Sequence, residues 1–190
     1  MRSGRSYGAA ALLAAFGLAL LASCSWIPFV GKKSASQKPA NPACPITVIL
    51  HPLANTAVFN ATGVQGELKP LNVAWYGIFS DVQATCTMSG GTLHAALDNV
   101  IVAERGPGAR GNDVDLNYFV ALTGSDQSIL GKKSFAVHIT VPDKDKRGGV
   151  SDHVEVAFST GGRPVSDLNI TLGFQESPQA IEFYKNFRGR

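Results

Sequence analysis

From Cys44 to Phe174 large apolar residues recur at every second position, and this period of two restricts the fold more than any other feature. Successive side chains of a β-strand point to opposite faces, so an alternating strand buries one face and leaves the other in water. The longest such runs are Val114–Leu122, Phe135–Val141 and Leu168–Phe174. Shorter runs occur at residues 46–50, 71–79, 82–88, 92–103 and 154–158. The pattern indicates an all-β domain.

Glycine-rich turn signals separate these runs. They are Ser89-Gly90-Gly91, Gly106-Pro107-Gly108, Gly124-Ser125-Asp126, Gly148-Gly149 and Gly161-Gly162. Short alternating strands joined by such turns are typical of antiparallel sheets with one buried face. The sequence therefore predicts an antiparallel β-sandwich of about eight or nine strands.

The C-terminal segment has a different character. Ser177 is suited to cap a helix, and Pro178 is suited to its first position. We expect a short helix from Pro178 to about Phe187. Its aromatic residues Phe183, Tyr184 and Phe187 are expected to cover an edge or an end of a sheet.

The first 23 residues have the composition of an export signal. Arg2 and Arg5 precede an almost unbroken apolar run of 14 residues from Ala9 to Ala22. A membrane-spanning helix needs about 20 such residues, whereas the central region of a signal peptide is shorter. We therefore expect residues 1–23 to be a signal peptide.

The apolar run ends in Leu21-Ala22-Ser23-Cys24. This segment resembles the lipobox of bacterial lipoproteins, and the resemblance implies lipidation of the Cys24 thiol and cleavage directly before Cys24. In proteobacterial lipoproteins Asp after the cysteine favours retention in the inner membrane. Ser25 stands there instead, which implies the inner leaflet of the outer membrane, facing the periplasm. The alternative is an ordinary signal peptide that is cut elsewhere, with Cys24 incidental.

Residues 24–43 are predicted to be a lipidated flexible tether, and the folded domain is predicted to span residues 44–190. Trp26, Ile27, Phe29 and Val30 follow the anchor. They either sit among the lipid headgroups or dock on the domain. Residues 31–42 are polar and lack any period, so they bury too little to offset the entropy of ordering.

The chain contains three cysteines. If the lipid takes Cys24, an even pair remains in an oxidising compartment, and we expect Cys44 and Cys86 to form a disulfide. The alternative is two free buried thiols. A zinc site is not expected, because it needs more Cys and His at close spacing than this chain offers.

Several short segments occur in a fixed order after the tether. They are Cys44-Pro45, Phe59 followed by Gly63, Cys86, Glu104-Arg105-Gly106-Pro107, Tyr118-Phe119-Val120-Ala121, Phe135 and Gly173-Phe174-Gln175. In this order they resemble a family of uncharacterised lipoproteins of alphaproteobacteria. That family has no assigned activity, so the resemblance implies a location and no chemistry.

No catalytic motif is recognisable in the sequence. There is no Gly-x-Ser-x-Gly elbow, no phosphate-binding Gly-Lys-Ser/Thr loop and no His-Glu-x-x-His. His94, His138 and His153 fall on the polar faces of expected strands, where they are solvated. The Ser151-Asp152-His153 run holds the residue types of a hydrolytic triad, but neighbours in a strand point in alternate directions and cannot form a relay. No cofactor or metal is predicted.

The charge balance argues against a nucleic-acid partner. Without Arg2 and Arg5 the chain keeps 15 basic residues (17 − 2) against 14 acidic ones, a net charge of +1. Such a chain creates no strong field to attract phosphates.

These features together predict a non-catalytic binding or envelope-assembly module. It is held by its lipid in the membrane and binds another envelope protein. Arg105, at the end of an expected strand, and the aromatic residues Phe183, Tyr184 and Phe187 are the candidate contacts. The alternatives are a hydrolase whose site is assembled from distant residues, and a structural envelope lipoprotein.

Overall fold

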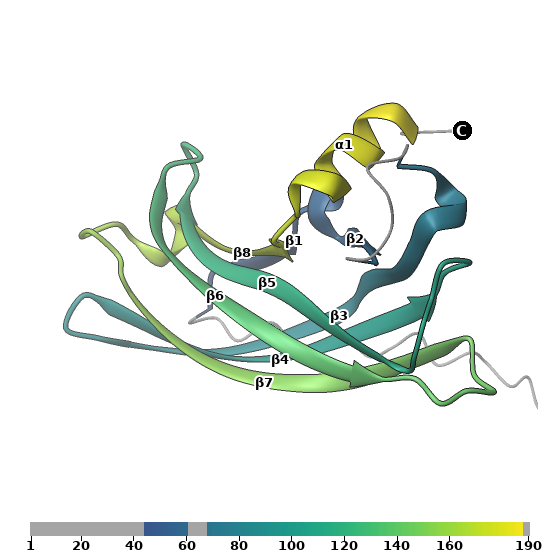
Figure 1. The fold of residues 1–190 in the computed structure, drawn as a ribbon. Coiled ribbons are helices and arrows are strands. Elements are labelled where there is room, and N and C mark those ends of the chain that lie inside the picture. The colour runs from purple at the N-terminus through teal and green to yellow at the C-terminus, as the bar shows by residue number, and fades with distance from the viewer. Residues whose placement is uncertain (1–43, 61–67, 188–190) are drawn as a thin grey trace, which may run out of the picture. The chain divides into compact units, whose positions relative to one another are not determined.

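Eight β-strands form two four-stranded sheets in the part of the chain that the computed structural model describes, residues 44–60 and 68–187 (Figure 1). Sheet A has the order β1-β8-β5-β6, and sheet B has the order β2-β3-β4-β7. The strands are β1 (Ile46–Ile49), β2 (Asn55–Phe59), β3 (Val73–Ser89), β4 (Thr92–Arg105), β5 (Asp113–Gly124), β6 (Ile129–Thr140), β7 (Arg147–Ser159) and β8 (Leu168–Phe174). Three short 3-10 helices, η1 (His51–Leu53), η2 (Pro70–Asn72) and η3 (Val165–Asp167), and one α-helix, α1 (Pro178–Phe187), complete the described elements.

The predictions of a mostly β chain and of one short C-terminal helix are confirmed. Strands β5, β6, β7 and β8 contain the alternating runs from which they were predicted. The pairs in the described sheets are antiparallel, except that β1 runs parallel to β8. The expectation of a fully antiparallel arrangement is therefore wrong for this one pair.

Two strands differ from the sequence prediction. Residues 71–79 and 82–88 were expected to be separate strands, but they lie in the single long strand β3, whose register shifts between Phe79 and Asp81. A β-bulge of this kind lets a strand bend without ending. Strand β2 was not predicted, because its sequence Asn-Thr-Ala-Val-Phe does not alternate between large apolar and polar residues.

One predicted turn is also misplaced. Gly148 and Gly149 lie inside β7, and the chain reverses earlier, where the Asp145 amide donates to the Pro142 carbonyl. A Cβ atom at Gly148 would come within 3.1 Å of the Thr140 carbonyl oxygen. Gly148 therefore lies where the end of β6 approaches β7 closely, and not in a turn.

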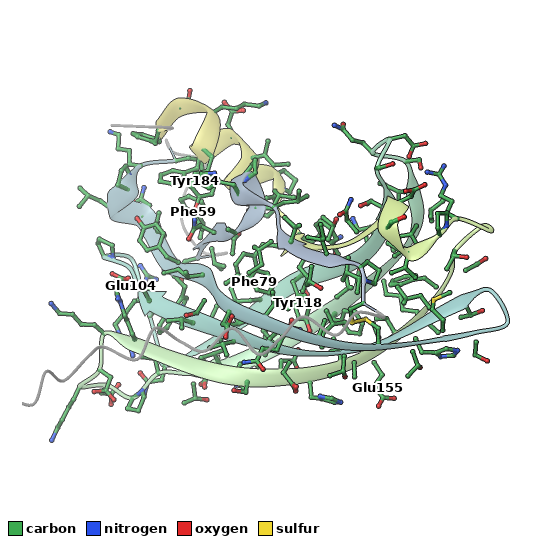
Figure 2. The ribbon with its side chains drawn as sticks, turned by 180° about the vertical axis from the view of Figure 1, so that it is seen from behind. Phe59, Phe79, Glu104, Tyr118, Glu155 and Tyr184 are labelled. Atoms are coloured by element: carbon green, nitrogen blue, oxygen red, sulfur yellow. A yellow bond between two sulfur atoms is a disulfide. The ribbon has the colours of Figure 1, made fainter. Side chains whose placement is uncertain are left out.

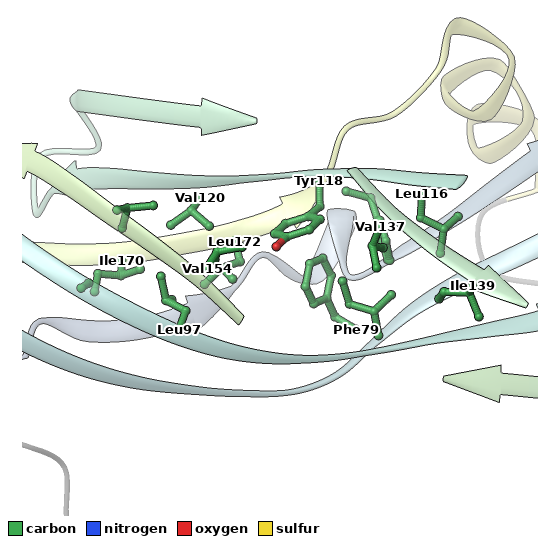
Figure 3. Close-up of a cluster of buried hydrophobic side chains, with 14 of the residues drawn as sticks. Phe79, Leu97, Leu116, Tyr118, Val120, Val137, Ile139, Val154, Ile170 and Leu172 are labelled. Carbon is green, nitrogen blue, oxygen red and sulfur yellow. The ribbon is translucent and has the colours of Figure 1, made fainter. Parts of the chain in front are cut away.

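The apolar faces of both sheets contribute to one core. Phe79 of β3 contacts Tyr118 of β5 edge to face and Phe174 of β8 at a tilt, with ring centroids 5.6 and 4.6 Å apart. Figure 3 shows the Phe79 and Tyr118 rings among aliphatic side chains from both sheets, which include Leu97, Val120, Val154, Ile170 and Leu172. Each fully buried side chain of this size stabilises the fold by about 1.5–3 kcal/mol.

A disulfide joins Cys44 to Cys86, as predicted. It links Cys44, two positions before β1 of sheet A, to Cys86 near the C-terminal end of β3 in sheet B, across 42 positions of sequence. Closing a loop of this length reduces the entropy of the unfolded chain and stabilises the fold by roughly 4 kcal/mol. The start of β1 is thereby held against the other sheet.

Helix α1 covers the edge of sheet B formed by β2, as expected. The Ser177 hydroxyl accepts a hydrogen bond from the Ala180 amide, which confirms Ser177 as the cap. Phe183 is buried against Ala57 and Val73 and meets the Phe59 ring edge to face at 5.4 Å. Figure 2 shows Phe59 and Tyr184 together below the helix.

The connections of the two sheets gather at two opposite ends. The β3–β4, β5–β6 and β7–β8 connections lie at one end, which is on the left in Figure 1. The chain enters β1 at this end, because Ile46 pairs with Asn169 at the start of β8. The β4–β5 and β6–β7 connections lie at the other end, where Arg105 is found.

Candidate functional site

Arg105 is the first candidate contact residue, and its side chain is engaged within the domain. Its guanidinium lies 4.7 Å from the centroid of the Trp75 ring. It donates hydrogen bonds to the carbonyls of Gly111 and Val141 and to the Asn112 side chain. These contacts hold the β4–β5 loop to the β6–β7 turn, so Arg105 braces both connections. A direct contact between Arg105 and a partner stays a prediction.

The aromatic residues of α1 differ in accessibility. Phe183 is only 4% exposed, so its side chain cannot meet a partner while the helix stays in place. Phe187 remains partly exposed beside Phe183, with ring centroids 4.9 Å apart. Of the three predicted contacts in this helix, Phe183 is therefore a packing residue.

The histidines lie on the outward faces, as the strand phase predicted. His138 Nδ1 is 2.8 Å from Asp115 Oδ1, and His153 Nδ1 is 2.8 Å from Asp98 Oδ1. The hydrogen bond to the neighbouring carboxylate raises the pKa of each imidazole. Within the described residues these two exposed imidazoles pair with carboxylates and not with a nucleophilic side chain.

A buried polar cluster lies in the core, and the sequence interpretation missed it. The Tyr118 hydroxyl of β5 donates to Asp152 of β7 at 2.5 Å and accepts a 3.3 Å hydrogen bond from the Asn99 amide of β4. Asn99 and Asp152 are direct partners across the β4–β7 pair. Burial raises the pKa of the Tyr118 phenol, and the Asp152 carboxylate raises it further. The phenol therefore stays protonated and acts as a fixed donor across the two sheets.

The phase of the strands contained a signal for this cluster. Asn99 has the same parity as the buried residues Leu97 and Ile101, and Asp152 has the same parity as Val154 and Val156. Inward-pointing polar residues of this kind are expected to be hydrogen-bonded. The Asp152 side chain points inward and His153 points outward, which confirms that the two cannot form a relay.

Glu176 is a carboxyl group whose pKa lies well above its ordinary value. It follows β8 and lies half-buried, where burial raises its pKa to about 7, although a 3.2 Å hydrogen bond from the Thr56 hydroxyl favours the charged form. Its other oxygen, Oε1, is buried and has no hydrogen-bond partner among the described residues. Burial and the nearby Glu176 carboxyl also raise the pKa of the Tyr184 phenol to about 12.

One hollow lies beside Glu176, and a second lies against β3, β4 and β7. The smaller, about 170 Å³, lies between β2, β5 and the N-terminus of α1, and polar residues such as Thr56, Asn117 and Gln179 line it. The larger, about 530 Å³, adjoins Cys86, His94, Lys133 and Glu155. The lining of the larger hollow includes Thr87, His94 and Glu155, but within the described residues His94 makes no hydrogen bond to a hydroxyl or a carboxylate, as a hydrolytic site would need.

Within residues 44–60 and 68–187 no group of three or more His, Cys, Asp or Glu side chains is arranged to hold a metal ion. No helix in the same ranges has the length and apolar character needed to cross a membrane. The lipidation site at Cys24 lies outside the described residues.

Comparison of the chain with protein-family models, with curated proteins and with solved structures finds no match. The resemblance to alphaproteobacterial lipoproteins therefore stays a prediction.

We predict that Glu176→Gln makes the domain more stable at neutral pH. The folded-state pKa of about 7 lies above the ordinary 4.5, so the stability of the protonated form is complete below pH 4.5 and is lost as the pH rises through 7. At pH 8 the variant should exceed the wild type by about 1 kcal/mol, after allowance for solvent screening of a half-exposed group. Urea unfolding between pH 4 and 8 measures this gap.

Asp143→Asn provides the control, because Asp143 is exposed in the connection between β6 and β7. Its pH dependence should follow that of the wild type. A Glu176→Gln curve parallel to the wild-type curve at every pH would contradict the burial of a neutral carboxyl group.

Proposed function

We propose that the chain is an exported lipoprotein whose residues 44–190 form a β-sandwich that binds another protein of the cell envelope. In this proposal Cys24 carries the lipid, residues 24–43 are the tether, and the domain faces the periplasm from the outer membrane. The proposed activity is binding or assembly and not catalysis.

The Cys44–Cys86 disulfide is the observation that carries the proposal. Disulfides persist in oxidising compartments such as the periplasm and are rare in the bacterial cytosol. Because the chain has three cysteines, this bond leaves Cys24 as the one cysteine outside it. Cys24 ends the apolar run in the manner of a lipobox, so the disulfide and the motif support the same location.

The positions of the polar groups support a binding function. The Tyr118 hydroxyl donates to Asp152 and accepts from the Asn99 amide across the core, whereas Asn99 Oδ1 has no hydrogen-bond partner among the described residues. The Arg105 contacts give the β4–β5 and β6–β7 loops a fixed shape at the end of the domain opposite the chain entry. A rigid loop surface at the far end of a tethered domain is well suited to meet a partner.

One observation favours the enzyme alternative. A carboxyl with a pKa of about 7 beside a hollow, as at Glu176, is the kind of group that general acids and bases use. Its nearest polar companions are Thr56 and Tyr184 rather than a histidine. Binding therefore remains the better-supported function.

We predict that Cys24→Ala abolishes labelling of the protein by a fatty-acid probe in living bacteria. The thiol is the acceptor of the lipid, so its loss should also release the protein from the membrane fraction. Membrane association that is unchanged in the variant, together with an unlabelled wild type, would contradict the lipid anchor.

We predict that crosslinking in intact bacteria joins the domain to a specific envelope protein at its loop end. The same adduct, identified by mass spectrometry, should form with His138→Ala and His153→Ala and should weaken with Arg105→Ala, which frees the two loops that Arg105 braces. Thermal melts of the variants separate loss of binding from loss of folding. Hydrolytic turnover by the purified protein that disappears with Glu176→Gln would overturn the binding function in favour of an enzyme.

A further inference from the structure

The outward face of sheet A carries three exposed apolar side chains near the end where the chain enters the domain, Ile46 and Val48 on edge strand β1 and Ile129 on edge strand β6. Strand pairing forms two neighbouring rows across this sheet. The first row is Ile46, Asn169, Thr123 and Ile129, and the second is Val48, Thr171, Ala121 and Lys132. Both rows lie on the side of the sheet opposite the buried residues Val120 and Leu122 of β5, but Thr171 and Ala121 in the middle of the second row are buried.

The corresponding face of sheet B is polar. Its rows near the same end are Gln83, Asp98 and His153, and Thr85, Ala96 and Glu155. In Figure 2 Glu155 projects away from the domain on this side. The two outward faces therefore differ in chemistry, although both belong to sheets of four strands.

The apolar side chains of sheet A are among the most exposed in the domain. Ile46 is 70% exposed and Ile129 is 67% exposed, and Val48 adds a third exposed apolar side chain in the adjoining row. Single exposed apolar residues are common, but several in neighbouring rows are typical of a surface that binds something. We call Ile46, Val48, Ile129 and Lys132 the entry surface.

We propose that the entry surface lies against the lipid bilayer in which the chain is anchored. This inference rests on the proposed lipid anchor and adds an orientation to it. The tether then holds a specific face of the domain on the membrane and does not leave the domain free to rotate.

The position of the chain entry favours a bilayer as the occupant. The tether ends at Cys44, two positions before Ile46, and the disulfide fixes that point beside β3. A flexible coil of 19 residues, the number between Cys24 and Cys44 (43 − 24), would have an r.m.s. span of roughly 24 Å. The bilayer is therefore the apolar phase that the anchor brings within reach of this surface.

The charge of the entry surface also suits lipid. Lys132 is the one charged residue in the two rows, and its ammonium lies over the Phe119 ring at 4.3 Å from the centroid. A lysine beside exposed apolar side chains pairs with lipid phosphates while its neighbours enter the headgroup region. On sheet B, Asp98 and Glu155 would be repelled by the same phosphates.

The test uses tryptophan reporters in the full, lipidated chain bound to vesicles of phosphatidylethanolamine and phosphatidylglycerol with brominated acyl chains. Bromine quenches tryptophan only on contact, so Ile46→Trp and Ile129→Trp should lose more fluorescence than the parent chain with its native tryptophans. Leu71→Trp is the matched control. Leu71 is 72% exposed but lies in η2, at the end of sheet B where β3 begins. It should show no quenching beyond that of the parent.

Equal quenching of Ile46→Trp and Leu71→Trp would overturn the inference. The inference also fails if Trp at position 46 is shielded from water without bromine quenching, because a second copy or a protein partner would then cover the surface. Flotation of the parent chain with the vesicles tests the anchor separately. If the parent chain floats but Ile46→Trp shows no extra quenching, the lipid anchor is supported and the proposed orientation is rejected. If the parent chain fails to float, the anchor itself is rejected.

Discussion

The hydrogen bond from the Tyr118 hydroxyl to Asp152 is the contact that fixes how the two sheets meet. Apolar burial supplies most of the stability, but it is non-directional and tolerates many relative positions of two apolar faces. A phenol that must reach a carboxylate on the opposite sheet tolerates far fewer. Asn99 donates to the same hydroxyl from the neighbouring strand, so an incorrect alignment would leave three polar groups unsatisfied in the core.

The alignment of the sheets determines the difference between the two ends of the domain. With Tyr118 opposite Asp152, the β3–β4, β5–β6 and β7–β8 connections gather beside the chain entry, and the Arg105 loops gather at the far end. The disulfide reinforces the first end, and the cation–π contact of Arg105 with Trp75 orders the second. In the proposed function these ends have separate roles: one faces the membrane and the other meets a partner.

The sequence predicted the elements whose alternation is long and regular. Strand β8 and helix α1 begin and end at the predicted residues, because period-two burial and the Ser177 cap are local signals. It did not predict β2 or the continuous β3, since a short edge strand and a bulge leave little trace in the pattern. Glycine at position 148 serves a close approach between strands, which only the three-dimensional packing reveals.

The site was less predictable than the fold. Asn99 and Asp152 had the parity of inward residues, but the alternation around them was interpreted only through its apolar positions, so the two polar side chains were not predicted to be buried. Glu176 becomes half-buried because the chain brings it to Thr56 of the edge strand β2, across 120 positions of sequence. No local pattern encodes such a contact. The disulfide was predictable because counting cysteines needs no geometry.

A double-mutant cycle at Tyr118 and Asp152 tests most directly whether the polar contact joins the two sheets. Urea unfolding of Tyr118→Phe, Asp152→Ala and the double variant gives the coupling free energy between the two side chains. We expect a coupling of about 1–3 kcal/mol, because each single variant leaves the remaining polar side chain buried without its hydrogen bond. Strictly additive effects would contradict the account, since they would mean that the hydroxyl and the carboxylate contribute independently to the stability of the domain.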